Sequence, residues 1–245
     1  MSDTPFNLAV DTAKSIANIE LGRPAAGNRL NASEVAELGR TIRAAGGRKD
    51  VKVVVVRANG DAFCLGRAPG SGPAPANALA LRTELAEPIL SLYADVRATE
   101  VPVLAVVQGP AMGFGSAFVG VCDLAIASDK ARFAFTEMEH NLPPTLAMSA
   151  VIDKIPAKLL LHMVLTRAEL TAPEAQAAGL ISQATTAADL EATAQATLAR
   201  LIDRDRSAIC CVKEYLLNAL KLDPASSARL AANAIAVVLS SQAKH

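Results

Sequence analysis

The chain has 245 residues, enough to bury a full hydrophobic core in one or two domains. Its composition, 51% hydrophobic and 20% charged, excludes a disordered chain. The formal net charge is zero and there is no long basic run, so we expect neither nucleic acid nor membrane as a partner. No stretch approaches the ~18 apolar residues of a membrane span, and the polar start lacks a signal-peptide pattern.

Cysteines and histidines indicate reduced thiols and no metal site. The four cysteines lack C-x-x-C spacing, and two of them, Cys210 and Cys211, are neighbours that are poorly suited to pair with each other. Three histidines in all make a His-rich metal site improbable. Reduced thiols predict a cytoplasmic protein.

The first part of the chain predicts strands and one well-defined helix. Alternating apolar residues predict a hairpin over 7–10 and 15–21. A capping-box pattern at Asn31 predicts a helix that ends at the glycine pair 46–47. The valine-rich segment 51–58 is typical of a strand buried on both faces in a parallel sheet.

The rest of the chain predicts further strands and then a helical half. A Gly/Pro-rich run covers 69–75, and helical periodicity over 79–96 contains Pro88, which predicts a kink or a break. From residue 145 on, we expect only helices. The expected strands cover 101–107, 124–127 and 132–135, and the expected helices cover 145–155, 157–165, 172–178, 190–203, 208–220 and 225–240.

Two turns, each after a buried strand, are the strongest candidates for chemistry. They are Ala62-Phe63-Cys64-Leu65-Gly66 and the glycine-rich stretch 109–118. On neighbouring strands they could aim the backbone N–H groups of Leu65 and Phe114 at one oxygen. Each such donor contributes about 2.7–4 kcal/mol to an oxyanion-like transition state. The alternative for the second turn is a tight strand-to-helix crossover without chemistry.

A carboxylate near that oxygen could move a proton at the adjacent carbon. Glu137, at a predicted strand end, is the best-placed candidate, with Glu139 and His140 as possible auxiliary groups. The alternatives are a structural carboxylate satisfied by backbone N–H groups for Glu137, a solvated charge for Glu139 and an exposed loop histidine for His140.

Several familiar motifs are excluded. Phe118 stands where the dinucleotide fingerprint needs glycine or alanine, and no P-loop pattern is present. Ser116 lacks the spacing of a nucleophile elbow, which makes it a small helix residue.

Five segments of the chain are informative together: 23–31, 62–66, 102–127, 130–137 and 170–180. In this order and spacing they resemble the crotonase (enoyl-CoA hydratase/isomerase) family over nearly the whole chain. The resemblance implies an α/β fold, with a ββα spiral core over 1–190 and a C-terminal helical trimerisation region over 191–245. It also implies acyl-CoA thioester substrates, no cofactor other than the coenzyme A of the substrate, and a homotrimer or a dimer of trimers.

The resemblance also assigns contacts within the site. It implies that the Leu65 and Phe114 N–H groups hold the thioester oxygen. Arg23 and Arg29 could meet CoA phosphates, since arginine matches phosphate geometry, although solvated surface arginines are the alternative. The residues expected to contact CoA or the acyl group are Arg23, Ala62, Cys64, Gly66, Arg67 and Gly113.

The carboxylate pattern departs from that of the family's hydratases. These carry two glutamates, which fall on Ala117 and Glu137 of this chain. A hydratase uses two carboxylates to grip and activate water, whereas a single base is enough to carry a proton from C2 to C4 of a 3-enoyl thioester. The one-glutamate pattern resembles the family's double-bond isomerases. Enoyl-CoA isomerisation is therefore the leading hypothesis.

Two other hypotheses stay open. Hydration is the second, because another residue could position water. The third is a CoA-ester-binding trimer with little or no catalysis. It is favoured by Ala117, by Arg67-Ala68 in place of a small residue and an aspartate, and by an end at His245, short of the final helix of many members. Related Clp-type proteases are excluded, since their serine and histidine fall on Gly113 and Thr136.

Overall fold

A six-stranded sheet forms the centre of the molecule. The computed structural model describes residues 4–68 and 76–242, so the Gly/Pro-rich run at 69–75 lies outside the described residues. The strand order is β1-β2-β3-β4-β6-β9, antiparallel for the first pair and parallel from β2 onward. The bounds are β1 (Phe6–Asp11), β2 (Ile16–Leu21), β3 (Val53–Ala58), β4 (Val103–Val107), β6 (Leu124–Ser128) and β9 (Gln183–Thr185).

The sequence pattern predicted most of this sheet. The hairpin of β1 and β2 is confirmed, and the four consecutive valines of β3 are fully buried, as expected for an internal parallel strand. A second, three-stranded sheet contains β5 (Ala111–Met112), β7 (Arg132–Ala134) and β8 (Leu170–Thr171). The expectation of helices alone after residue 145 is wrong, because β8 and β9 lie there. Strands of two or three residues are too short to show a period of two.

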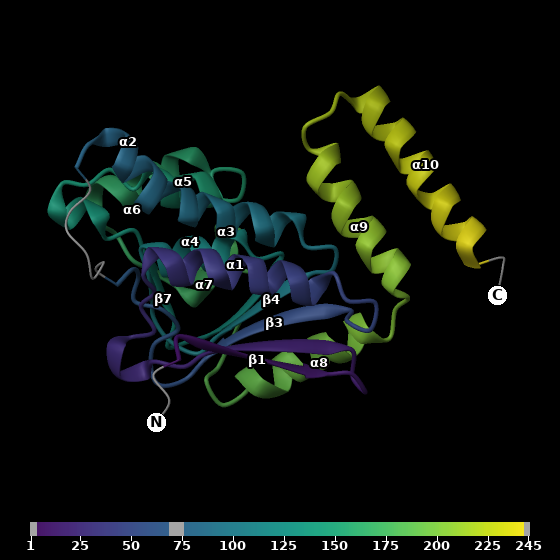
Figure 1. Ribbon diagram of the computed structural model, residues 1–245, viewed down its shortest axis with the longest axis horizontal. Coiled ribbons are helices and arrows are strands. Elements are labelled where there is room, and N and C mark those ends of the chain that lie inside the picture. Colours follow the sequence, from purple (N-terminus) through teal and green to yellow (C-terminus); the bar gives the residue numbers. More distant parts are fainter. Residues whose placement is uncertain (1–3, 69–75, 243–245) are drawn as a thin grey trace.

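Helices cover both faces of the large sheet (Figure 1). On one face lie α1 (Ala32–Gly46) and α3 (Glu87–Ala98), which pack against each other. On the other face α8 (Leu190–Ile202) buries Leu190, Ala194 and Leu198 against the sheet. This packing makes α8 part of the core. The C-terminal helical region predicted from the sequence, which begins at residue 191, had included nearly all of α8.

Local sequence determines where α1 and α3 begin. The Asn31 side chain accepts a hydrogen bond from the Glu34 N–H at 3.0 Å, and the Glu34 carboxylate accepts one from the Asn31 N–H at 2.8 Å. The predicted kink or break near Pro88 is a π-helical segment (Arg82–Ala86), through which α2 (Ala78–Leu81) continues into α3 without a break; Pro88 lies in the first turn of α3. Proline lacks the N–H that a regular helix would need.

A fully buried helix lies next to the two predicted turns. All eight residues of α4 (Phe114–Val121) are buried. The chain then passes through a 3-10 helix (Glu137–His140) and the helices α5 (Thr145–Val151), α6 (Ala157–Thr166) and α7 (Ala172–Ala177). None of the helices that the structure describes is long and apolar enough to cross a membrane.

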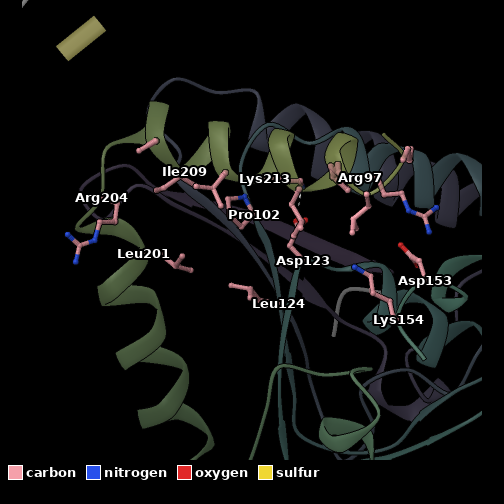
Figure 2. Close-up of a pocket in the computed structure, with 16 residues that line it drawn as sticks. Arg97, Pro102, Asp123, Leu124, Asp153, Lys154, Leu201, Arg204, Ile209 and Lys213 are labelled. Atoms are coloured by element: carbon pink, nitrogen blue, oxygen red, sulfur yellow. Dashed lines mark hydrogen bonds and ion pairs between the residues drawn. The ribbon is translucent and has the colours of Figure 1, made fainter. Parts of the chain in front are cut away.

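The last two helices, α9 (Arg206–Ala219) and α10 (Pro224–Gln242), form a pair that extends away from the sheet (Figure 1). One buried lysine on α9 ties this pair to the core. Lys213 donates to the carbonyls of Val96 at 3.0 Å and Val101 at 3.2 Å, and its Nζ lies 2.7 Å from Oδ2 of Asp123. Both residues line a cavity of about 650 Å³ between α9 and the core. Figure 2 shows Lys213 and Asp123 next to each other among its lining residues.

We expect Asp123→Asn to destabilise the protein by about 3–5 kcal/mol, because it leaves the Lys213 ammonium buried without a counter-charge. The Lys213 side chain is only 5% exposed, so solvent cannot replace the lost partner. Urea denaturation of both proteins measures the difference. The matched control is Asp50→Asn in the exposed Arg48–Asp50 pair, where we expect a loss below about 1 kcal/mol. Equal losses in both variants would contradict this account.

Candidate active site

The structure brings the two predicted turns together through their main chains. The N–H groups of Phe63 and Cys64 donate to the Pro110 carbonyl at 3.0 and 3.3 Å, and the Met112 N–H donates to the Cys64 carbonyl at 2.9 Å. A Cβ atom at Gly109 would lie 1.7 Å from the Asp61 carbonyl oxygen, and one at Gly115 would lie 2.1 Å from the Cys64 carbonyl oxygen. Only glycine allows the two backbones to approach this closely.

A serine hydroxyl links the second turn to the small sheet. Ser116 is fully buried, and its Oγ lies 2.6 Å from the Ala111 carbonyl oxygen and accepts a hydrogen bond from the Ala134 N–H at 3.1 Å. These contacts join α4 to β5 and β7. They agree with the sequence analysis, which excluded Ser116 as a nucleophile.

The Phe114 N–H is available to a ligand. Phe114 is the first residue of α4, so its N–H has no carbonyl partner within the helix, and no other backbone partner is found among the described residues. The positive end of the helix dipole adds to the attraction for a partial negative charge. The Phe114 ring stacks on Phe118, with centroids 6.0 Å apart, and also lines the cavity described below.

The structure corrects the prediction for Leu65. Its N–H donates to the Gly27 carbonyl at 2.8 Å and is therefore already satisfied. Two residues further on, Arg67 pairs with Leu30 in a parallel bridge, in which the Ala68 N–H donates to the Leu30 carbonyl at 2.8 Å. In an extended chain successive N–H groups point to opposite sides, so the Arg67 N–H points away from Leu30. It has no backbone partner within the described part of the chain.

Glu137 lies against the second turn. It follows β7 and opens the 3-10 helix, and a Cβ atom at Gly113 would lie 3.0 Å from its Oε1. The carboxylate therefore sits beside the residue that precedes the Phe114 N–H. Its Oε2 is buried and has no hydrogen-bond partner among the described residues, which speaks against a carboxylate fully satisfied by the backbone.

Burial raises the pKa of Glu137 above its ordinary value, opposed by a hydrogen bond from its own backbone and by the positive charge of Arg67. A carboxylate with a raised pKa is a stronger base, because its charged form is poorly solvated. The position can therefore accept and return a proton.

Glu137 opens onto a cavity of about 180 Å³. This is smaller than the roughly 300–1,000 Å³ of most ligand pockets. Its polar lining consists of Arg67, Tyr93 and Glu137, and its apolar lining is Ile89, Phe114, Leu142, Pro143, Pro144, Leu146 and Ala147. Glu137 is the one carboxylate among these lining residues. Ala117, where a second glutamate would stand, is fully buried in α4 and does not line the cavity.

Glu139 and His140 are exposed, and neither lines this cavity. The structure therefore does not bring these two auxiliary candidates to the site. No cluster of three or more His, Cys, Asp or Glu side chains that could hold a metal ion occurs among the described residues.

The remaining predicted contacts lie around the first turn. Ala62 and Gly66 form its backbone, and Cys64 is a buried thiol whose pKa is raised to about 11 by burial, which makes it unreactive. Nη2 of Arg23 pairs with Glu34 and donates to the Arg29 carbonyl at 2.8 Å, whereas its buried Nε has no partner among the described residues. Arg29 is exposed, and its Nη1 would lie 3.5 Å from a Cβ at Gly66. Of the two arginines beside the first turn, Arg29 is therefore the more accessible to a ligand.

Comparison with known proteins identifies the family. The enoyl-CoA hydratase/isomerase family model matches residues 11–244. The chain belongs to the enoyl-CoA hydratase/isomerase family. It is 28% identical over 220 residues to the rat enoyl-CoA hydratase domain-containing protein 3, covering 90% of this chain and 73% of the relative. It is 30% identical over 179 residues to the Escherichia coli K12 2,3-dehydroadipyl-CoA hydratase, covering 71% and 68%.

Solved structures of the family share the fold. A putative enoyl-CoA hydratase from Thermobifida fusca YX, solved in complex with CoA, superimposes with a TM-score of 0.86 at 26% identity over 98% of this chain and 95% of that one. The predicted crotonase-like α/β fold is thereby confirmed.

Sequence reasoning missed Tyr93 and the Arg67 N–H. Tyr93 occupies a core-facing position of α3, and nothing in the local pattern sets it apart from Leu92 or Val96. The Arg67 N–H becomes identifiable only when the pairing partners of Leu65 and Ala68 are known.

We expect Gly115→Ala to displace the first turn, because the new methyl group would meet the backbone of Cys64 rather than a flexible side chain. The expected cost is about 1–3 kcal/mol or more, measured by urea denaturation, together with loss of CoA-ester binding. Gly47→Ala is the control, since the nearest atom to its Cβ lies 3.5 Å away and the residue is already in a helical conformation. A stable Gly115→Ala protein with normal binding would refute the need for close backbone contact.

We expect Glu137→Gln to stabilise the protein at neutral pH. Because the pKa is raised in the folded state, wild type loses stability as pH rises from the ordinary value of 4.5 through the raised value, and the glutamine variant does not. Each 1 kcal/mol corresponds to roughly 2–4 °C in unfolding temperature for a chain of this size. The gap between the two proteins should close as pH is lowered below 4.5. Exposed Glu139→Gln should show no such gap, and an equal gap there would contradict burial as the cause.

Proposed function

We propose that this protein isomerises the double bond of a short enoyl-CoA thioester, with Glu137 as the single acid/base group. The observation that carries the proposal is the position of the Glu137 carboxylate against Gly113, next to the free Phe114 N–H and in a cavity with no second carboxylate among its described lining residues. A thioester α-proton becomes acidic only when the resulting enolate is stabilised.

The reaction then needs only groups that this chain supplies. The Phe114 and Arg67 N–H groups bind the thioester oxygen, and Glu137 removes a proton from C2 of a 3-enoyl ester. The electron pair moves onto that oxygen as an enolate. When the enolate collapses, the double bond moves to C2–C3 and the protonated Glu137 returns its proton to C4, so no atom is gained or lost.

Hydration is the second candidate, favoured by the names of the relatives, several of which are hydratases. It would require a second group to position water, and Ala117 supplies none. The third candidate is binding of CoA esters with little or no turnover.

We further propose that the protein is a homotrimer or a dimer of trimers that acts in the cytoplasm. Support for assembly comes from large apolar side chains left exposed on α9 and α10, a pattern that marks interaction surfaces. They include Val212, Leu216, Ile235, Val237 and Leu239. Support for the reducing compartment comes from the four cysteines, all of which are unpaired.

One assay separates the three activities. Purified protein is offered a 2-enoyl-CoA and a 3-enoyl-CoA, and products are followed by mass, which rises by one water only on hydration. We expect an isomer of unchanged mass from the 3-enoyl ester and a loss of about 10²–10⁴-fold in kcat for Glu137→Gln. A variant that keeps the wild-type rate would eliminate Glu137 as the catalyst. Binding without turnover would favour the third candidate.

A further inference from the structure

The buried hydroxyl of Ser116 joins the two strands that lead to the proposed catalytic groups. Its Oγ lies 2.6 Å from the Ala111 carbonyl oxygen and 3.0 Å from the Ala134 carbonyl oxygen, and it accepts a hydrogen bond from the Ala134 N–H at 3.1 Å. Serine hydroxyls in helices commonly bond a carbonyl of their own helix, whereas this one contacts main-chain groups of β5 and β7. Ser116 is fully buried, so solvent does not reach these groups in its place.

The strand pairing that this hydroxyl supports is short. β5 and β7 pair over two residues each, Ala111 with Phe133 and Met112 with Ala134. One further main-chain bond follows, from the Gly113 N–H to the Ala134 carbonyl at 2.8 Å. Because so short a ladder contains few hydrogen bonds, the contacts of the hydroxyl are a large part of the polar contacts that hold these two strands together.

The two strands place the two groups of the proposed reaction. β5 continues through Gly113 to the Phe114 N–H, and Glu137 is the third residue after the end of β7. Among the described residues, the Glu137 carboxylate receives a hydrogen bond only from its own backbone, and its Oε2 receives none. No other element of the described chain therefore holds the carboxylate by a hydrogen bond, and its position follows that of the main chain after β7.

The reaction depends on the accuracy of that position. A base and an oxyanion donor act together only when both reach the thioester in one binding mode, and a misplacement of about 1 Å can lower the rate about 10²-fold. The carboxylate already lies close to the second turn, since a Cβ atom at Gly113 would lie 3.0 Å from Oε1 of Glu137. A shift of β7 relative to β5 would therefore change the distance between the base and the Phe114 N–H directly.

We propose that Ser116 is a positioning residue, whose hydroxyl sets the distance between the Glu137 carboxylate and the Phe114 N–H by fixing β7 against β5 and α4. This inference rests on the proposed function for the reaction that the two groups perform. Ser116 itself touches no substrate and exchanges no proton with it. It acts through Glu137, because the strand that it holds leads to that residue.

Ser116→Ala removes only the hydroxyl and tests the inference. We expect kcat for a 3-enoyl-CoA to fall about 10–10²-fold, because proton transfer depends on the placement of Glu137. We expect the Kd of hexanoyl-CoA, a saturated ester that cannot be isomerised, to remain close to the wild-type value in calorimetry. The Phe114 N–H that binds its thioester oxygen stays at the start of the buried helix α4.

Thr99→Val is the matched control. Thr99 is also buried, its hydroxyl donates to the Asp95 carbonyl at 2.7 Å, and it does not line the cavity at Glu137. Valine keeps the shape of the side chain and removes the hydroxyl, so both variants lose a buried hydrogen bond and should lose stability in urea. We expect Thr99→Val to keep the wild-type kcat. Ser116→Cys, whose thiol is a weaker donor and acceptor, should give an intermediate kcat.

Three results would overturn the inference. Ser116→Ala could keep the wild-type kcat, it could lose no more activity than Thr99→Val, or its activity could fall through weaker ester binding with kcat unchanged. If Ser116→Ala does not fold, a wild-type kcat in Ser116→Cys would overturn the inference in the same way.

An infrared titration of the Glu137 carboxyl group separates this inference from the proposed function, because it needs no turnover. Glu137→Gln assigns the band. Burial raises the pKa of Glu137, so a carboxylate displaced toward water in Ser116→Ala should have a lower pKa. If wild type does not isomerise, but Ser116→Ala lowers this pKa and Thr99→Val does not, the positioning stands and isomerisation fails. If wild type isomerises and Ser116→Ala changes neither kcat nor the pKa, isomerisation stands and the positioning inference is wrong.

Discussion

The site depends on the close backbone contact between the turn at 62–66 and the turn at 109–115. Main-chain hydrogen bonds through Pro110 and Met112 join the two turns, and glycines at the tightest points remove the side chains that would keep them apart. The second turn leads directly into α4, which is buried along its whole length and so fixes the end of the turn. Because a packed core deforms little, the N–H of Phe114 is held at a fixed position before any ligand arrives.

The cavity beside this contact contains buried polar groups that lower the stability of the fold and make Glu137 a stronger base. Glu137 and Tyr93 each keep an unsatisfied buried oxygen, which costs free energy in the folded protein. The same burial raises the pKa of Glu137 and so suits it to accept a proton. The positive charge of Arg67 moderates that shift. Such a balance between stability and activity is common where a site needs groups in poorly solvated positions.

The C-terminal helices α9 and α10 are joined to the core by an ion pair that lies away from the candidate site. The Lys213–Asp123 ion pair anchors α9 at the start of β4, because Asp123 Oδ2 also accepts the Val103 N–H at 2.8 Å. Beyond this anchor, α9 and α10 expose apolar side chains that the described chain does not cover. The anchor and the cavity at Glu137 lie at separate places on the core, since the residues lining the two cavities do not overlap.

The sequence by itself determined the family, the buried parallel strands, the capped start of α1, an irregularity of the helix near Pro88 and Glu137 as the candidate base. The family follows from the resemblance of five segments, whereas the strands, the cap and the irregular helix follow from periodicity and capping, which depend only on residues close together in the sequence. Only the tertiary structure decided that the Leu65 N–H is occupied by Gly27 and that the Arg67 N–H is free, since backbone pairing joins segments far apart in sequence. It also decided that Tyr93, Arg67 and Glu137 share one cavity, because that depends on how α3 and two separate loops pack together.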